Sequence, residues 1–263
     1  MRIIFFFSLL IGTCCQQVFC QSFIEVYSGY QLGFGDRASM TKRVINHSDD
    51  SKNSEEAKNF QIGDGFNIGI HGSKALGELI NVGIGVEYFS GFKTTGGNYQ
   101  SVSGNDDNPQ IGAWTSQSNQ IVTVKGNLIQ LVPAIALIKG NDKFSGFVKA
   151  GIVLGSGSVI HDYRSESIYT SNQGTEKSSS FSTFRESGGV AYGSELSVGV
   201  GRKFTKRMSL LGSVRLKYVF YNPSKDADGN TAVLPPSNSH LGESHHFKSV
   251  DFQFSAKWVL GEL

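Results

Sequence analysis

The chain has 263 residues, with 24 Lys and Arg against 22 Asp and Glu. This near balance of charge, without a run rich in Lys or Arg, argues against a protein that binds nucleic acid. The 32 Gly, 19 Phe and 9 Tyr, beside only 5 Pro, indicate aromatic-rich β-strands and argue against a mainly helical enzyme.

The N-terminus has the pattern of a secretory leader. Arg2 precedes an apolar run over residues 3–11, and Val18-Phe19-Cys20 offers a cleavage site before Gln21. The run is too short for a spanning helix, so residues 1–20 are predicted to be a signal peptide. The three cysteines, Cys14, Cys15 and Cys20, all lie inside it. The predicted mature chain, residues 21–263, therefore has no disulfide and no thiol chemistry.

Eight later segments alternate apolar and polar residues, which is the pattern of a β-strand with two different faces. In the third segment, Ile80, Val82 and Ile84 share one face, whereas Asn81 and Gly83 share the other. The predicted strands cover residues 24–34, 61–71, 80–93, 121–137, 144–155, 190–201, 209–221 and 249–260.

The fourth segment is less regular, because Leu128-Ile129 and Leu131-Val132 are adjacent apolar pairs. We assign Ile129, Leu131, Pro133, Ile135 and Leu137 to one face, although a β-bulge would shift this register.

The connections alternate in length. Short ones follow the second, fourth and sixth strands, at residues 72–79, 138–143 and 202–207. Long polar ones follow the first, third, fifth and seventh strands, at about residues 35–59, 94–118, 161–188 and 222–245. Such a rhythm is typical of outer-membrane barrels, with the long loops outside the cell. We therefore predict an all-β fold, an eight-stranded antiparallel up-and-down transmembrane β-barrel in a bacterial outer membrane with periplasmic termini.

The polar face of the strands is predicted to line the lumen. It carries glycines, small hydroxyls and about one charge per strand, where a water-facing surface would be crowded with Lys and Glu. Buried charges persist when they are paired, so near balance predicts a structural network of ion pairs. With a turn about Thr205, Glu195 lies opposite Arg215, and barrel closure brings Lys257 near Glu25. The predicted network comprises Glu25, Glu87, Lys149, Glu195, Arg215, Lys217, Asp251 and Lys257.

Aromatic residues on the apolar face cluster toward the ends of the strands. Amphipathic rings prefer the interface between membrane and water, so two belts are expected on a lipid-facing surface. The predicted interface residues are Tyr30, Phe34, Tyr88, Tyr192, Tyr218, Phe220 and Trp258.

With these features the sequence resembles the small outer-membrane β-barrel proteins of the Bacteroidetes type, including PorT-like proteins. The resemblance covers the leader before Gln21, the strand with Leu131-Val132-Pro133, and the strand with Phe147-Val148-Lys149-Ala150-Gly151. It implies outer-membrane lipid and the barrel-assembly machinery as partners. The PorT-like label further implies a component of a secretion machine.

Candidate chemical sites are few. Residues 240–246 hold three histidines and Glu243, a set able to bind a metal, but we interpret this spacing in a polar loop as incidental. The pair His71 and Ser73 lies at the short-turn end, the wrong rim for the membrane lipases. We predict no catalytic residue, no metal site, no cofactor and no enzymatic activity.

The leading hypothesis is a membrane anchor that displays surface loops for binding, adhesion or envelope structure. The partner would be an unidentified extracellular ligand or envelope protein. The alternatives are a narrow transport channel or secretion-machine component, a lipid-modifying barrel enzyme, and a soluble lipocalin-like barrel with its apolar face inside.

Overall fold

The computed structural model describes residues 21–34, 38–39, 42–46, 59–60, 64–105, 113–224 and 245–260. The predicted signal peptide, most of the first long connection and most of the last lie outside the described residues. Within the described residues, no helix is long and apolar enough to cross a membrane.

All regular structure in the described residues is β-strand. The strands are β1 (Ser22–Gly33), β2 (Ala38–Ser39), β3 (Lys42–Asn46), β4 (Asn59–Phe60), β5 (Gly65–Ala75), β6 (Ile80–Gly91), β7 (Thr94–Asn105), β8 (Ala113–Gly140), β9 (Phe144–Ser171), β10 (Gly174–Lys203), β11 (Met208–Asn222) and β12 (His245–Leu260).

Eight strands close into a ring of hydrogen bonds in the order β8-β6-β5-β1-β12-β11-β10-β9, with β9 returning to β8. Every neighbouring pair in this ring is antiparallel. Each ring strand overlaps one of the eight predicted segments, so the prediction of an eight-stranded antiparallel up-and-down barrel is confirmed. The start of β1 pairs with the end of β12, which places both at the rim of the short turns.

The apolar face of the ring strands points outward. Ile84 in β6 is 51% exposed and Val86 is similarly exposed, whereas Glu87 and Phe89 are buried inside. The same division holds in the other ring strands, where exposed Ile, Leu and Val alternate with inward polar or small residues. The lipocalin-like alternative, which needs the apolar face inside, is therefore wrong.

Strand β8 contains no bulge in its pairing with β6 or β9, since its register with both is constant. Ile129, Leu131 and Ile135 lie outside as predicted, while Leu128 and Val132 are buried inside. The adjacent apolar pairs thus arise because β8 carries apolar residues on both faces here. One residue of each pair belongs to an apolar layer inside the barrel, and the other belongs to the apolar exterior.

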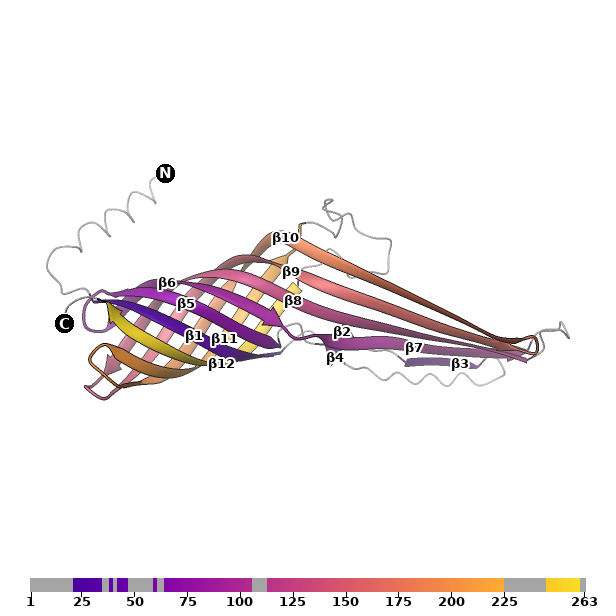
Figure 1. Cartoon of the computed structure of the whole chain (residues 1–263), viewed down its shortest axis with the longest axis horizontal. Helices are drawn as coiled ribbons and strands as arrows, with labels where there is room; N and C mark the ends of the chain where they lie inside the picture. The colour runs from indigo at the N-terminus through magenta and orange to yellow at the C-terminus, as the bar shows by residue number, and fades with distance from the viewer. Residues whose placement is uncertain are drawn as a thin grey trace.

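Two of the expected long loops are instead strands. Residues 94–118 hold β7 and the start of β8, and residues 161–188 hold the end of β9 and the start of β10. These segments continue beyond the ring as a long open sheet, in which β3 pairs with β7 in parallel (Figure 1). The alternation that marks the ring is absent here because this sheet encloses no core that requires one face to be apolar.

The register of β10 changes where the open sheet joins the ring. A β-bulge lies between Gly188 and Ala191, and both Gly188 and Gly189 have positive φ, at 69° and 71°. A Cβ atom on Gly189 would lie 1.8 Å from the carbonyl oxygen of Asn222. Only glycine satisfies both the backbone conformation and this close approach.

Replacement of this glycine is expected to destabilise the barrel. Gly189→Ala should lower the free energy of unfolding by about 1–3 kcal/mol, because of the strained φ and the steric clash. Urea titration of the protein refolded in detergent micelles measures the change. Gly212→Ala is the matched control, since a Cβ there meets no atom within 4 Å. Equal stability of the two variants would contradict the assigned role of the bulge.

Candidate functional site

The lumen is crossed near its middle by a layer of polar and charged side chains, here called the charge layer. Every strand of the ring contributes at least one member. The charge layer comprises Tyr27, Asn67, Glu87, Gln130, Lys149, Glu195, Arg215, Lys217 and Asp251.

Arg215 on β11 lies at the centre of the charge layer and is 0% exposed. Its Nη1 donates to Glu87 Oε2 at 2.5 Å and to Glu195 Oε2 at 2.9 Å. Its Nε donates to Asp251 Oδ2 at 2.7 Å, and Nη2 donates to both Glu87 and Asp251. One guanidinium therefore joins carboxylates from β6, β10 and β12, as its planar set of five donors permits.

The carboxylates have further partners. Glu87 accepts hydrogen bonds from Lys217 Nζ and from the Tyr27 hydroxyl, the latter at 3.1 Å. Asp251 accepts a hydrogen bond from Ser249 Oγ at 2.9 Å and one from Asn67 Nδ2 at 3.3 Å. The additional donors replace the water that these buried oxygens have lost.

The formal charges of the layer balance. Its three carboxylates face three cations, because Lys149 Nζ lies 3.9 Å from Glu195 Oε1. Such a network is costly to disturb, since removal of one partner leaves the others buried and uncompensated. The layer thus fixes the relative positions of all eight ring strands.

The structure brings together six of the eight predicted network residues. Glu25 and Lys257 lie nearer the short-turn rim, directly paired between β1 and β12. The predicted position of Glu195 opposite Arg215 is wrong by two residues, because the register places Glu195 opposite Lys217. The turn between β10 and β11 is centred one residue later than Thr205, yet the long Arg215 side chain still reaches Glu195 diagonally.

Below the charge layer, a cavity of about 900 Å³ reaches the short-turn rim. Its lining includes Glu25, His71, Lys149, Lys203 and Lys257. His71 and Ser73, the pair noted in the sequence, both line it, and Glu25 lies directly opposite His71 in the pairing of β1 with β5. The lumen is therefore open to solvent from this rim as far as the charge layer.

Above the charge layer, apolar side chains fill the lumen. They include Phe89, Leu128, Val153, Val219 and Phe247, all nearly or fully buried. Phe89 and Phe247 meet edge to face, with ring centroids 5.9 Å apart. Sequence reasoning missed this layer, because Phe89 and Val153 stand singly among glycines and polar residues on the inward face.

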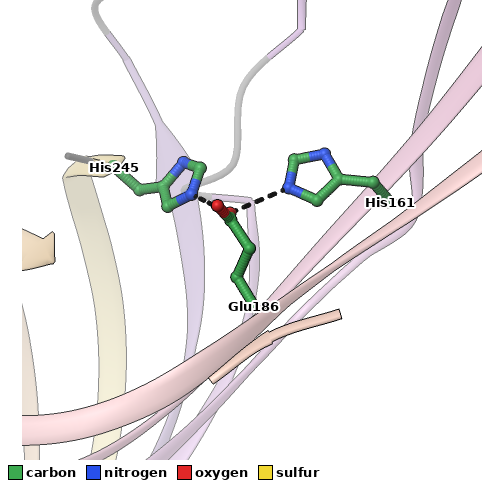
Figure 2. Close-up of side chains that lie close together, drawn as sticks. All are labelled: His161, Glu186 and His245. Atoms are coloured by element: carbon green, nitrogen blue, oxygen red, sulfur yellow. Dashed lines mark hydrogen bonds and ion pairs between the residues drawn. The ribbon is translucent and has the colours of Figure 1, made fainter. Parts of the chain in front are cut away.

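A cluster of two histidines and one glutamate lies where the ring meets the open sheet (Figure 2). Glu186 Oε2 accepts from His161 Nε2 at 3.2 Å and from His245 Nε2 at 2.6 Å, and all three residues are buried. Burial, and then the charge of Glu186, raise the pKa of the nearby Tyr163 hydroxyl above its usual value. His245 belongs to the predicted histidine-rich segment, whereas His240 and Glu243 lie outside the described residues.

The predicted interface aromatics lie on the outer face. Tyr30, Tyr88 and Tyr192 are exposed near the long-connection ends of their strands. Tyr192 stacks on Phe220 with centroids 5.5 Å apart, and Tyr218 meets Phe220 edge to face at 4.5 Å. Phe34 is also exposed there, whereas Trp258 lies toward the other rim.

Comparison with known proteins adds little beyond the fold. No protein-family model matches the chain, and no curated protein matches it. Among solved structures, the attachment invasion locus protein Ail of Yersinia pestis is similar at 10% identity, with a TM-score of 0.32 over 92% of this chain and 97% of that one. Neisserial surface protein A (NspA) is similar at 8% identity, with a TM-score of 0.35 over 91% and 96%. Likeness of this degree carries no conclusion about activity.

Removal of the central guanidinium should destabilise the barrel strongly. Arg215→Met leaves three buried carboxylates near one another with only lysines for compensation, so we expect a loss of about 3–5 kcal/mol in the free energy of unfolding. Urea titration in detergent micelles measures this loss. Lys206→Met, at an exposed position in the turn between β10 and β11, is the control and should change stability little. A loss below about 1 kcal/mol for Arg215→Met would contradict the central role of the charge layer.

Proposed function

We propose that the protein is an integral outer-membrane β-barrel with a closed lumen, which anchors an extracellular β-sheet used for binding. The observation that carries the proposal is the combination of an apolar exterior with a lumen sealed by the charge layer. The first property suits a membrane, and the second leaves the barrel without a through-going path.

The height of the apolar exterior matches a membrane. On β10 the outward apolar residues run from Val190 to Val200, both exposed. Ten rises of about 3.3 Å along a strand tilted by about 40° give a height of about 25 Å. That value is the height of the apolar band of outer-membrane barrels, and the aromatic residues at both of its ends support the same placement.

The interior favours an anchor over a channel. The charge layer occupies the width of the lumen with side chains from all eight strands, and the apolar layer lies directly above it. An ion would have to displace a balanced network and then cross a desolvated apolar region. Neither step is compatible with steady conduction.

The open sheet is the part suited to meet a partner. If the short turns face the periplasm, as is usual, the open sheet extends outside the cell. Within the described residues, the backbone of β10 pairs only with β9 from Gly174 to Arg185, which leaves its other edge available to a further strand. Phe181, which belongs to this edge strand, is 71% exposed. Such an edge can bind an extended peptide segment by adding it as a further strand.

A second candidate is a component of a secretion machine, as the PorT-like resemblance implies. The cavity at the short-turn rim favours this candidate, because it offers charged side chains such as Lys203 and Lys257 to the periplasmic side. In that case the partner would bind the cavity, while the charge layer would still close the barrel.

A barrel with a closed lumen should conduct no ions across a membrane. The purified mature protein, inserted in a planar lipid bilayer, should give no steady ionic current, because the charge layer and the apolar layer both block the lumen. The control is the same addition of detergent without protein. A steady current that scales with the amount of protein would overturn the anchor proposal and favour a transport channel.

If the exterior faces lipid, a charged residue on it should lower the free energy of unfolding more, the deeper it lies in the membrane. Ile84→Arg, at the middle of β6, should lower the free energy of unfolding in lipid vesicles by about 2–4 kcal/mol. Urea titration of the protein refolded in vesicles, followed by tryptophan fluorescence, measures the change. The control is Phe204→Arg, an exposed position in the turn after β10, where the cost should be below about 1 kcal/mol. Similar costs at both positions would contradict the membrane placement.

A further inference from the structure

The cluster of His161, Glu186 and His245 brings together donors from three strands, of which β12 is distant in sequence from the β9–β10 hairpin. His161 comes from β9, Glu186 from β10 and His245 from the first position of β12. One ligand atom from each residue lies within 4.8 Å of the other two. Their convergence is a property of the fold and has no local sequence motif.

The backbone around the cluster is arranged to aim Glu186 inward. In the ladder Glu186 pairs with Val159, which places its side chain on the same face as His161 two residues away. The bulge at Gly188 follows directly and changes the inward positions of β10 from even to odd numbers. The bulge absorbs one extra residue of β10, so Glu186 shares the inward face with His161, and bulges of this kind commonly lie next to a functional site.

Aromatic neighbours hold both imidazoles in place. Tyr163 stacks on His161, and Tyr221 stacks on His245, each with centroids 6.2 Å apart. The Tyr221 hydroxyl shares its one proton between the carbonyl oxygens of Gly157 and Gly188, which lie 2.7 and 2.8 Å away, so this ring is itself fixed to the bulge. The three donors are therefore preorganised by packing around them.

We propose that His161, Glu186 and His245 bind a divalent transition-metal ion, with Zn²⁺ as the best match. Two imidazole nitrogens and one carboxylate oxygen are the donor set of many three-ligand zinc sites. In a tetrahedral site with bonds of about 2.0–2.1 Å, neighbouring ligand atoms lie about 3.3 Å apart. The distances from Glu186 Oε2 to the two Nε2 atoms are 3.2 and 2.6 Å. Both distances lie below the tetrahedral value, and the ligand atoms of the two histidines lie within 4.8 Å of each other.

Metal binding replaces two hydrogen bonds by three coordination bonds. As hydrogen-bond donors to Glu186, both imidazoles carry their proton on Nε2, and as ligands they present that nitrogen unprotonated. Binding at neutral pH therefore leaves each ring neutral, with its proton on Nδ1. Three protein ligands leave a fourth position for water or for an anionic group of a partner. The site lies beyond the apolar exterior, at the base of the open sheet, and this role goes beyond the proposed function as an anchor.

The neighbouring histidine supplies a matched control. His246 follows His245 in β12, but its ring packs against Phe220 with centroids 4.8 Å apart, and its Nδ1 lies 3.5 Å from the Tyr218 hydroxyl. Because adjacent strand residues point to opposite faces, His246 belongs to the outer surface and is no ligand of this site.

The experiment titrates Zn²⁺ into the mature chain in detergent, prepared without a histidine tag and stripped with a chelator. Isothermal calorimetry should show one ion per chain, and His245→Ala, His161→Ala and Glu186→Gln should each weaken binding at least tenfold. His246→Ala should leave the affinity unchanged. The far-ultraviolet circular dichroism of each variant checks that the barrel is folded.

Substitution with Co²⁺ tests the site in the unaltered protein, which removes any dependence on variant folding. We expect visible absorption bands of a four- or five-coordinate Co²⁺ ion, lost on addition of one equivalent of Zn²⁺. Absence of these bands together with no calorimetric binding would overturn the proposal and leave a hydrogen-bonded cluster only. Binding that survives His245→Ala, or that is lost equally in His246→Ala, would also overturn it, because the ligands would then lie elsewhere.

Discussion

The charge of one buried guanidinium determines how this barrel is assembled. Arg215 cannot lose its proton in a protein, so its burial requires acceptors on every side, and carboxylates from β6, β10 and β12 supply them. Strands β10 and β12 are the direct neighbours of β11 in the sheet, whereas β6 lies across the lumen, so Glu87 meets Arg215 only when the ring closes. The network is consequently complete only in the closed barrel and incomplete in partially formed sheets. Its hydrogen bonds and ion pairs therefore stabilise closure specifically, in addition to the hydrophobic burial.

The layers of the lumen give its two ends different properties. Solvent reaches the charge layer from the short-turn rim through the cavity, whereas the apolar layer around Phe89 and Phe247 separates that layer from the open sheet. The low-dielectric layer on one side strengthens the ion pairs beneath it. The same arrangement makes the outer half of the barrel a solid support, on which a long sheet can stand without a pore through its base.

Much of the ring could be predicted from the sequence, because a strand with an apolar exterior and a polar interior must alternate. Ile84 and Glu87 in β6 were assigned to the correct faces for this reason. The register predicted for β10 with β11 differs by two residues from the one observed. A shift of two residues leaves every side chain on the same face, so the alternation does not distinguish the two registers, and the turn offers no distinctive residue. The sequence predicts loops where the strands of the open sheet lie, because residues such as Ser178 and Ser180 carry no apolar periodicity. His161, Glu186 and His245 were missed as a group, since only the three-dimensional path of the chain brings them together.

The bulge at Gly188 and Gly189 divides β10 into two halves with opposite inside–outside parity. Odd-numbered residues face the interior below it, such as Glu195, and even-numbered ones face the interior above it, such as Glu186. Loss of a single residue at this point would restore one continuous parity along the strand. It would leave the side chains of the outer half on their present faces, because Glu186 would then lie four residues before Ala191, just as Val159 lies four residues from Gly155 on β9. In evolutionary terms, the bulge is therefore one inserted residue that the strand absorbs locally, so that both halves of β10 keep the faces that they present.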